Sequence, residues 1–275
     1  MTTNEPQSPQ QALGHQRVGS GPNRVVILND WLCDTSTWDT AREFLDTGSF
    51  SFAFTDLRGY GRSRGRAGEF TLVEAAADVL ALADALGWQQ FALVGHSMSA
   101  LIALHLAQHA AQRVQRLVLL TPPPPSGFGK DEAMIAASQR LALADDATRL
   151  AVFEKRFGSR LSPGWTKFKA RRWRDTADPE AAAAYVALFT RDGLPSPGAI
   201  VEIPVLAITG EQDIPPMRAA AVTLALQSFC TQLEVVPLMD SGHYPMQELP
   251  ALTVALVERF LSEAPTSSSD TAVTT

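Results

Sequence analysis

The chain has 275 residues, of which 45% are hydrophobic and 19% are charged. This composition is that of an ordinary globular protein and excludes wholesale disorder. The formal net charge of −6 gives no overall electrostatic drive toward nucleic acid or an anionic membrane surface. Only two cysteines are present, Cys33 and Cys230, which excludes a disulfide framework or a cysteine-rich zinc site. We expect two buried free thiols rather than one bridge.

The two ends of the chain carry no signal that would place it in a membrane or export it. The first residues lack the basic and apolar regions of a signal peptide, and no apolar stretch approaches the ~20 residues of a membrane helix. We therefore expect a cytoplasmic protein as written. Residues 1–11 and 265–275 are rich in Ser, Thr, Gln and Pro, and we expect flexible tails there.

Between these tails the chain alternates between short apolar β-branched runs and helical patterns. The helix expected over residues 72–86 opens with a capping box, Thr71 to Glu74, and ends at Gly87. Further helices are expected over 100–110 and 250–261. Such alternation with short connections predicts a mostly parallel α/β sheet with helices on both faces. The expected strands are 24–28, 51–55, 91–94, 117–120, 205–209 and 233–236.

A run of prolines interrupts this pattern at residues 122–125. Four prolines fit neither a helix interior nor a central strand, so the chain must leave the sheet there. The next segment reads as helices rich in Ala, Leu and Arg, and it is too long for a plain crossover. We predict a helical cap over 123–198 on an α/β core formed by 12–122 and 199–264.

The segment Gly95-His-Ser-Met-Ser99 follows an expected strand and precedes an expected helix. This is the setting in which G-x-S-x-G forms a nucleophile elbow, a strained turn that presents the serine hydroxyl above the sheet edge. An ordinary strand–helix turn with an N-cap serine is the alternative. Ser99 replaces the usual final glycine, although a small residue still fits.

A base and an acid follow in the order that such an elbow requires. Asp213 comes directly after one expected strand, with Glu211 as a competitor two residues earlier, and His243 lies in the loop before the last helix. A serine hydroxyl needs a base to take its proton, and the base needs an acid to fix its tautomer. The sequence therefore predicts a Ser97–His243–Asp213 triad.

With these motifs, residues 13–263 resemble the α/β-hydrolase superfamily, and in particular its lidded small-substrate members. Residues 56–63 are similar to the family's D-x-R-G-x-G-x-S loop, and Gly-His-Ser-Met-Ser-Ala is similar to the elbow of the stress-regulator and strigolactone-receptor hydrolases. The resemblance implies that the backbone N–H groups of Trp31 and Met98 form the oxyanion hole. The family's His-Gly is Asn29-Asp30 here, however. We expect the Asp30 carboxylate to point away and brace its loop; the alternative is that it alters the chemistry.

The predicted function is hydrolysis of an ester or similar acyl bond of a small molecule, without cofactor or metal. Ser97 would be the nucleophile, His243 the base and then the acid, and Asp213 the group that orients His243. We expect no nucleic-acid or membrane partner, since the basic stretch 167–174 reads as a solvated cap helix. The expected substrate pocket is apolar or aromatic and includes Asp30, Trp31, Phe128, Trp165, Trp173, Tyr185 and Phe189.

Two other functions remain open at this point. The phrase around Trp31 also resembles the Gly-Trp-Cys-x-Asp loop of cofactor-free quinolone dioxygenases, which would use His243 to deprotonate a heteroaromatic such as a hydroxyquinolone and would not require Ser97. Those enzymes carry an acid after the strand that corresponds to 117–120, where this chain has Thr121 and prolines. A receptor-type hydrolase would turn over slowly and present a partner surface on the cap. The sequence does not give the oligomeric state.

Overall fold

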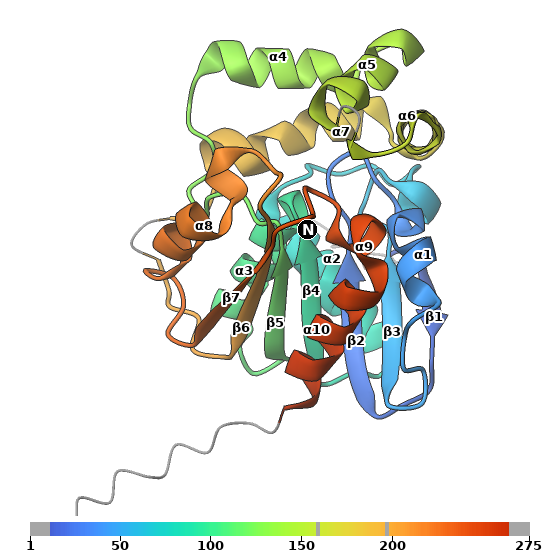
Figure 1. Cartoon of the computed structure of the whole chain (residues 1–275). Coiled ribbons are helices and arrows are strands. Elements are labelled where there is room, and N and C mark those ends of the chain that lie inside the picture. Colours follow the sequence, from blue (N-terminus) through green and yellow to red (C-terminus); the bar gives the residue numbers. More distant parts are fainter. Residues whose placement is uncertain (1–11, 158–159, 196–197, 264–275) are drawn as a thin grey trace, which may run out of the picture.

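The computed structural model describes residues 12–157, 160–195 and 198–263, and the tails predicted for 1–11 and 265–275 lie outside this range. The described residues form a seven-stranded sheet with the order β1-β3-β2-β4-β5-β6-β7 (Figure 1). Among the strands of the described residues, only β1 runs antiparallel to its neighbour. The strands are β1 His15–Val18, β2 Asn23–Leu28, β3 Phe50–Thr55, β4 Phe91–His96, β5 Val114–Leu120, β6 Val205–Gly210 and β7 Leu233–Leu238.

The six strands expected from the sequence are all present, and β1 is an addition. β2, β3, β4 and β6 are almost continuously apolar because helices cover both faces of the sheet. The sequence of β1, His-Gln-Arg-Val, carries no such run because this strand lies at the exposed edge of the sheet. The prediction of a mostly parallel α/β sheet is therefore confirmed.

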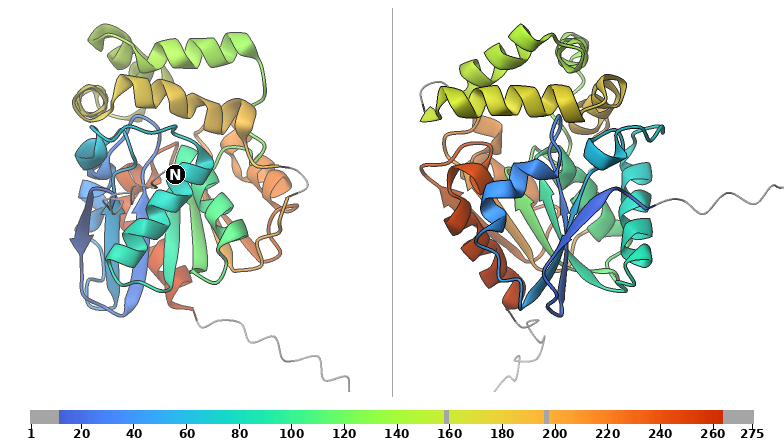
Figure 2. Two further views of the ribbon diagram at one scale, coloured as in Figure 1. Left: turned by 180° about the vertical axis from the view of Figure 1, so that it is seen from behind. Right: turned by 90° about the vertical axis from the view of Figure 1, so that its right-hand side faces the viewer.

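Helices cover the two faces of the sheet in the expected manner. α2 and α3 lie on one face, whereas the short α1 and the last helix α10 lie on the other, as the edge-on view in Figure 2 shows. α3 is buried on nearly every side because it packs against β4, β5 and α2. α8 follows β6 and packs against β6 and β7. The bounds are α1 Asp39–Arg42, α2 Leu72–Ala85, α3 Met98–His109, α8 Ala219–Leu226, α9 Pro245–Glu248 and α10 Pro250–Ser262.

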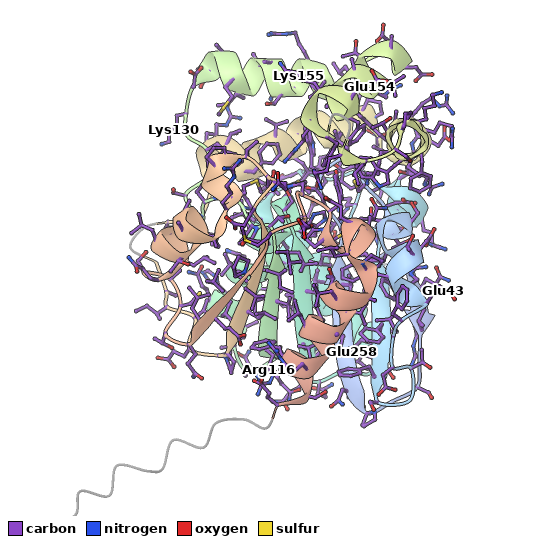
Figure 3. All side chains as sticks on the ribbon, viewed as in Figure 1. Glu43, Arg116, Lys130, Glu154, Lys155 and Glu258 are labelled. Atoms are coloured by element: carbon purple, nitrogen blue, oxygen red, sulfur yellow. The ribbon has the colours of Figure 1, made fainter. Side chains whose placement is uncertain are left out.

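A helical insertion between β5 and β6 lies over the carboxyl ends of the parallel strands (Figure 1). We call it the cap, and it consists of α4 Glu132–Ala142, α5 Asp146–Phe157, α6 Pro163–Thr176, α7 Pro179–Ala187 and a single-turn π-helix, η4, Leu188–Asp192. The labelled side chains Lys130, before α4, and Glu154 and Lys155, on α5, are exposed (Figure 3). The insertion matches the prediction, whereas 123–198 as the bounds of a separate domain stays a prediction.

Specific contacts fasten the cap to the core. The indole Nε1 of Trp31 donates to the carbonyl of Ala182 in α7 at 2.7 Å, and Asp178 N donates to the carbonyl of Gly59 at 2.8 Å. Cys33 and Cys230 are both buried free thiols, as expected. Within the described part of the chain, every helix is too short or too polar to cross a membrane.

Candidate active site

Ser97 occupies the sharp turn between β4 and α3. Its backbone angles are φ 52° and ψ −118°. Residues other than glycine rarely adopt this conformation, which is typical of a nucleophile elbow. A Cβ at Gly95 would lie 2.7 Å from the carbonyl oxygen of Ser99. The close approach of strand and helix thus depends on Gly95, and it holds Ser97 at the carboxyl edge of the sheet.

The replacement of the final elbow glycine by Ser99 has a structural explanation. The Ser99 hydroxyl accepts a hydrogen bond from His96 N at 2.9 Å and donates one to the His96 carbonyl at 3.1 Å. Ser99 is completely buried, and its small side chain closes the turn on both backbone groups of His96. A serine is therefore accommodated at this position, and its hydroxyl stabilises the turn through two local hydrogen bonds.

Asp213 and His243 meet above the same edge. The loop after β6 carries Asp213, and its Oδ2 accepts a hydrogen bond from His243 Nδ1 at 2.6 Å. A Cβ at Gly210 would lie only 2.0 Å from the Gly242 carbonyl, so the close approach of the two loops depends on glycine at position 210. Burial raises the pKa of Asp213, but the charges of His243 and Arg156 outweigh it, and the pKa lies below its ordinary value.

The competing acid, Glu211, is directed elsewhere. Its Oε1 accepts from Ala219 N at 2.9 Å, at the first residue of α8, and from the Thr209 hydroxyl at 3.2 Å. Glu211 is therefore engaged at the start of a helix, and Asp213 is the acid that contacts His243.

Asp30 departs from the expectation. Its carboxylate does not point away to brace the loop but lies in the site, with only 4% of the residue exposed. Oδ1 accepts from the backbone N–H groups of Trp31 at 2.5 Å and of Met98 at 3.4 Å. Oδ2 lies 3.3 Å from His243 Nε2, and the Ser97 side chain also hydrogen-bonds to this carboxylate.

The Asp30 carboxylate lies in the site because hydrogen-bond donors are available there. A buried carboxylate must find hydrogen-bond donors, and two backbone N–H groups, an imidazole and a hydroxyl converge at this point. Burial raises the pKa of Asp30, but the hydrogen bond and charge of His243 outweigh it, so the pKa lies below its ordinary value. Ser97, His243 and Asp30 thus form a triad-like arrangement, with Asp213 on the far side of the imidazole.

His243 is flanked by a carboxylate at each ring nitrogen. Burial and the charge of Arg156 lower its pKa, whereas Asp213 and Asp30 raise it, and the net pKa lies above the ordinary value. The two carboxylates therefore stabilise the imidazolium form, which can donate to both of them at once.

His96 supports the histidine loop. Its Nε2 donates to the carbonyl of His243 at 2.7 Å, and the Thr121 hydroxyl donates to the same carbonyl at 3.2 Å. Burial lowers the pKa of His96 to about 4, which keeps its ring neutral near pH 7. His96 therefore braces the loop that carries His243.

A cavity of about 130 Å³ adjoins the serine. It is mostly apolar, and its polar wall consists of the triad-like group and one cap arginine, Arg156. No pattern in the sequence separates Arg156 from the other arginines of the cap. The lining residues are Asp30, Trp31, Ser97, Met98, Pro123, Phe128, Arg156, Phe189, Ile214, Met217 and His243.

Three aromatic residues expected in the pocket lie elsewhere. Trp173 is buried in the cap against Phe153, and Tyr185 stacks on Tyr60 at 5.6 Å between ring centroids. Trp165 packs edge-on against Tyr244, and its Nε1 donates to Gln247. The cap has to bury its own apolar surface, and these large rings do so. Trp31, Phe128 and Phe189 do line the cavity, and the rings of Trp31 and Phe189 lie 5.2 Å apart.

Asp30, His96 and His243 form a group of potential metal ligands, with one donor atom from each within 4.8 Å of the others. His96 Nε2 is bonded to the His243 carbonyl, and His243 Nε2 is paired with Asp30. The hydrogen bond of His96 to the His243 carbonyl and the pairing of His243 with Asp30 account for the closeness of the three residues.

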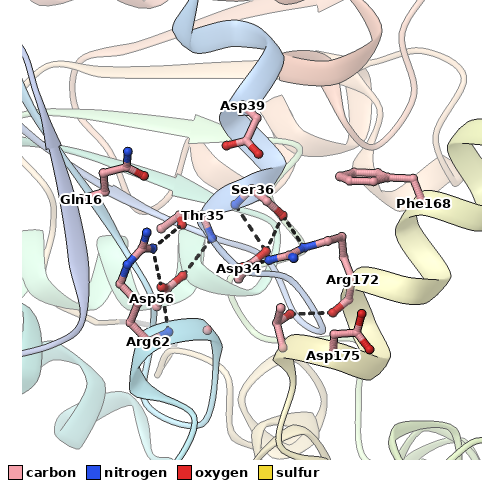
Figure 4. A pocket seen from close by; sticks show the side chains of 12 residues that line it. Gln16, Asp34, Thr35, Ser36, Asp39, Asp56, Arg62, Phe168, Arg172 and Asp175 are labelled. Atoms are coloured by element: carbon pink, nitrogen blue, oxygen red, sulfur yellow. Dashed lines mark hydrogen bonds and ion pairs between the residues drawn. The ribbon is translucent and has the colours of Figure 1, made fainter.

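A second, larger cavity of about 490 Å³ opens on the outer side of the loop that carries Asp30 (Figure 4). Its polar groups pair with each other. Arg172 of α6 binds Asp34, and the backbone N–H of Thr35 donates to the Asp56 carboxylate at 2.8 Å. Arg62 lies 3.3 Å from the same Asp56 carboxylate. These contacts join the loop after β2 to the cap and fix the backbone from which Asp30 and Trp31 project.

The sheet, the cap and the serine elbow define an α/β hydrolase. The family model described as alpha/beta hydrolase fold matches residues 32–248, and the chain belongs to this family. It is 26% identical over 272 residues to a pimeloyl-(acyl-carrier protein) methyl ester esterase of Nitrosospira multiformis, covering 91% of this chain and 98% of the relative. It is also 26% identical to AB hydrolase superfamily protein YisY of Bacillus subtilis, covering 90% and 92%.

Solved structures have the same fold. The enol-lactonase from Burkholderia xenovorans superposes with a TM-score of 0.76 at 24% identity, covering 91% of this chain and 96% of that chain. An esterase from Exiguobacterium antarcticum gives a TM-score of 0.76 at 19% identity, covering 90% and 95%. At this level of identity the likeness shows the fold alone.

Proposed function

We propose that this α/β hydrolase cleaves an ester or related acyl bond of a small molecule through an acyl-enzyme on Ser97. The observation that carries the proposal is the strained Ser97 elbow, together with a histidine that lines the same cavity and whose Nδ1 is held by Asp213 at 2.6 Å. A nucleophile, a base and an acid that orients the base are the elements that nucleophilic acyl transfer requires.

In this reaction Ser97 Oγ forms a bond to the carbonyl carbon while its proton passes to His243 Nε2. The C=O electron pair moves onto the carbonyl oxygen, for which the N–H groups of Trp31 and Met98 are the donors. When the intermediate collapses, His243 returns the proton to the leaving alcohol, and the acyl group stays on Ser97. Water then attacks the acyl-enzyme and gives a proton to His243, and His243 passes this proton to Ser97 Oγ as the acid is released.

The cavity supports a small substrate. Its volume of about 130 Å³ and its apolar walls, with Trp31, Phe128 and Phe189 among them, suit a short apolar or aromatic acyl group. The relative from Nitrosospira multiformis is named as a methyl ester esterase, which is consistent with ester cleavage.

The test combines covalent labelling with turnover. A fluorophosphonate should label the wild type at one site, Ser97, and p-nitrophenyl esters of short acids should be hydrolysed repeatedly. Ser97→Ala should abolish labelling and lower kcat by at least ~10³-fold, because only binding and the oxyanion hole would remain. Ser228→Ala, at an exposed serine, serves as the control. Undiminished turnover in Ser97→Ala would refute the proposal.

One observation favours a second candidate, the cofactor-free dioxygenase. Asp30 at His243 Nε2 raises the pKa of that histidine, and a more basic imidazole suits abstraction of a proton from an acidic heteroaromatic. Oxygen uptake with a hydroxyquinolone, unchanged in Ser97→Ala and lost in His243→Ala, would support this reaction in place of ester hydrolysis.

A further inference from the structure

The oxyanion hole already holds a ligand, and that ligand is part of the chain. Asp30 Oδ1 takes the hydrogen bonds of Trp31 N and Met98 N, the two donors needed by the carbonyl oxygen of a substrate. Oδ2 takes the place next to His243 Nε2 from which the leaving group would receive its proton. The carboxylate thus occupies the positions that two oxygens of a tetrahedral intermediate would need. No acyl group can react at Ser97 until Asp30 moves.

A series of side-chain contacts leads from the carboxylate to a buried cation. Asp30 Oδ2 already accepts a hydrogen bond from the Tyr244 hydroxyl at 3.4 Å. The ammonium group of Lys169, on cap helix α6, lies 4.0 Å from the centroid of the Tyr244 ring and 3.2 Å from Cys33 Sγ. Cys33 Sγ in turn lies 3.8 Å from the Tyr244 hydroxyl. Tyr244 and Cys33 therefore separate the carboxylate from a buried cation.

Lys169 has reason to attract a carboxylate. Only 3% of the residue is exposed, and in the described part of the chain no carboxylate oxygen lies within 4.0 Å of its ammonium group. Lysine is rarely buried unless it is paired, because an ammonium group removed from water requires compensation. A thiol and an aromatic face compensate only in part. The second carboxylate of the site, Asp213, is held by Arg156 and His243. Asp30 is therefore the carboxylate of the site that can pair with Lys169.

We propose that Asp30 is a movable internal ligand of the oxyanion hole, and that Lys169 is a positioning residue that receives its carboxylate when substrate enters. This inference rests on the proposed acyl transfer at Ser97. Rotation of the Asp30 side chain toward Tyr244 and Lys169 frees both backbone donors for the substrate oxygen. The same rotation takes a carboxylate away from His243 Nε2, and this favours the neutral imidazole that can accept the serine proton.

The proposal predicts an unusual gain of function. Asp30→Gly empties the hole and restores the residue that the family carries at this position. If the hole is occupied by Asp30 most of the time, the reactive fraction of the enzyme is small, and removal of the carboxylate restores it. We expect the second-order rate of Ser97 labelling by a fluorophosphonate to rise at least ~10-fold, and an alkylboronic acid, which forms a tetrahedral adduct on serine, to bind correspondingly more tightly. Asp39→Asn removes a nearby negative charge outside the site and should change neither value.

Lys169 is tested through its dependence on Asp30. Lys169→Met should slow labelling about 10-fold in the wild-type background, because the carboxylate loses its second position, but less than 2-fold in the Asp30→Gly background. Lys169→Arg should restore the wild-type rate, since the charge is retained. Lys167→Met, an exposed lysine on the same helix, is the matched control. Melting temperatures show which variants are folded, and Lys169→Gln replaces Lys169→Met if the latter is not.

The outcomes separate this inference from the proposed function. Labelling of Ser97 in the wild type that is no faster in Asp30→Gly would overturn the movable carboxylate while leaving acyl transfer intact. Equal effects of Lys169→Met in both backgrounds would assign Lys169 a structural role in the cap. If no variant, including Asp30→Gly, is labelled at Ser97, the proposed function itself fails.

Discussion

Arg156, on cap helix α5, donates a hydrogen bond at 3.0 Å to the one Asp213 oxygen that His243 leaves free. Asp213 Oδ1 thus pairs with the cap, and Asp213 Oδ2 pairs with the histidine of the core at 2.6 Å. Because Arg156 also lines the cavity, its positive charge contributes to the electrostatics of the site while the cap packs against the core.

Arg156→Gln should move the pH dependence of the reaction. The charge of Arg156 lowers the pKa of His243, so its removal should raise that pKa further above the ordinary value. The base form of His243 is required, and the rising limb of kcat/KM against pH should therefore shift to higher pH. Lys155→Gln, at the exposed neighbouring residue, should leave the profile in place. A shift toward lower pH in Arg156→Gln would contradict this account.

Asp213→Asn should lower kcat far more than Glu211→Gln. An amide at position 213 favours the wrong imidazole tautomer, and we expect kcat to fall by about 10³-fold or more. Glu211→Gln should leave kcat within a few fold, because Glu211 contacts the start of α8 and not the histidine. It should destabilise the fold by about 1 kcal/mol, because a neutral amide oxygen accepts a weaker hydrogen bond than a carboxylate. Steady-state kinetics and urea unfolding measure the two effects. A larger kinetic loss in Glu211→Gln would reverse the assignment of the acid.

His96 should make the fold sensitive to acid. Its pKa is lowered from the ordinary 6.5 to about 4 in the folded chain, so no stability is lost above pH 6.5, and stability is lost as the pH falls from there toward 4. Each pKa unit corresponds to about 1.4 kcal/mol, so at pH 4.5 the loss from this buried residue is about 2–3 kcal/mol. His96→Gln keeps a donor for the His243 carbonyl but does not titrate.

The measurement is the free energy of unfolding by urea at pH 7 and pH 4.5. The drop between the two pH values should be smaller in His96→Gln than in the wild type by about 2–3 kcal/mol. Identical drops would show that His96 is protonated in the folded protein without penalty.

Gly210→Ala should separate the acid from the histidine. The added Cβ would lie 2.0 Å from the Gly242 carbonyl, so one of the two loops has to shift. A displacement near 1 Å at a catalytic pair is enough to lower the rate about 10²-fold. Gly65→Ala is the matched control, because a Cβ there meets no atom within 4 Å. Wild-type labelling of Ser97 in a folded Gly210→Ala would show that the loops tolerate the added methyl group.

Much of this protein follows from local sequence. Continuous apolar runs predict β2 to β7 because both faces of these strands, or most of them, are covered, and the proline run after β5 predicts the point where the chain leaves the sheet. The candidate nucleophile, acid and base were predicted because each follows a strand, and the carboxyl ends of parallel strands meet at one edge. The strand β1 was missed because a short edge strand carries no hydrophobic pattern.

The orientation of single side chains was decided by the tertiary structure alone. Asp30 was expected to point away from the oxyanion hole, yet its carboxylate lies where donors from the loop after β2, the elbow and the histidine loop converge. Trp165, Trp173 and Tyr185 serve the packing of the cap. Arg156 lines the cavity and Lys169 contacts Cys33, and both come from cap helices far away in sequence. Sequence patterns report which face of an element is buried, whereas the partner of a buried charge depends on segments that only folding brings together.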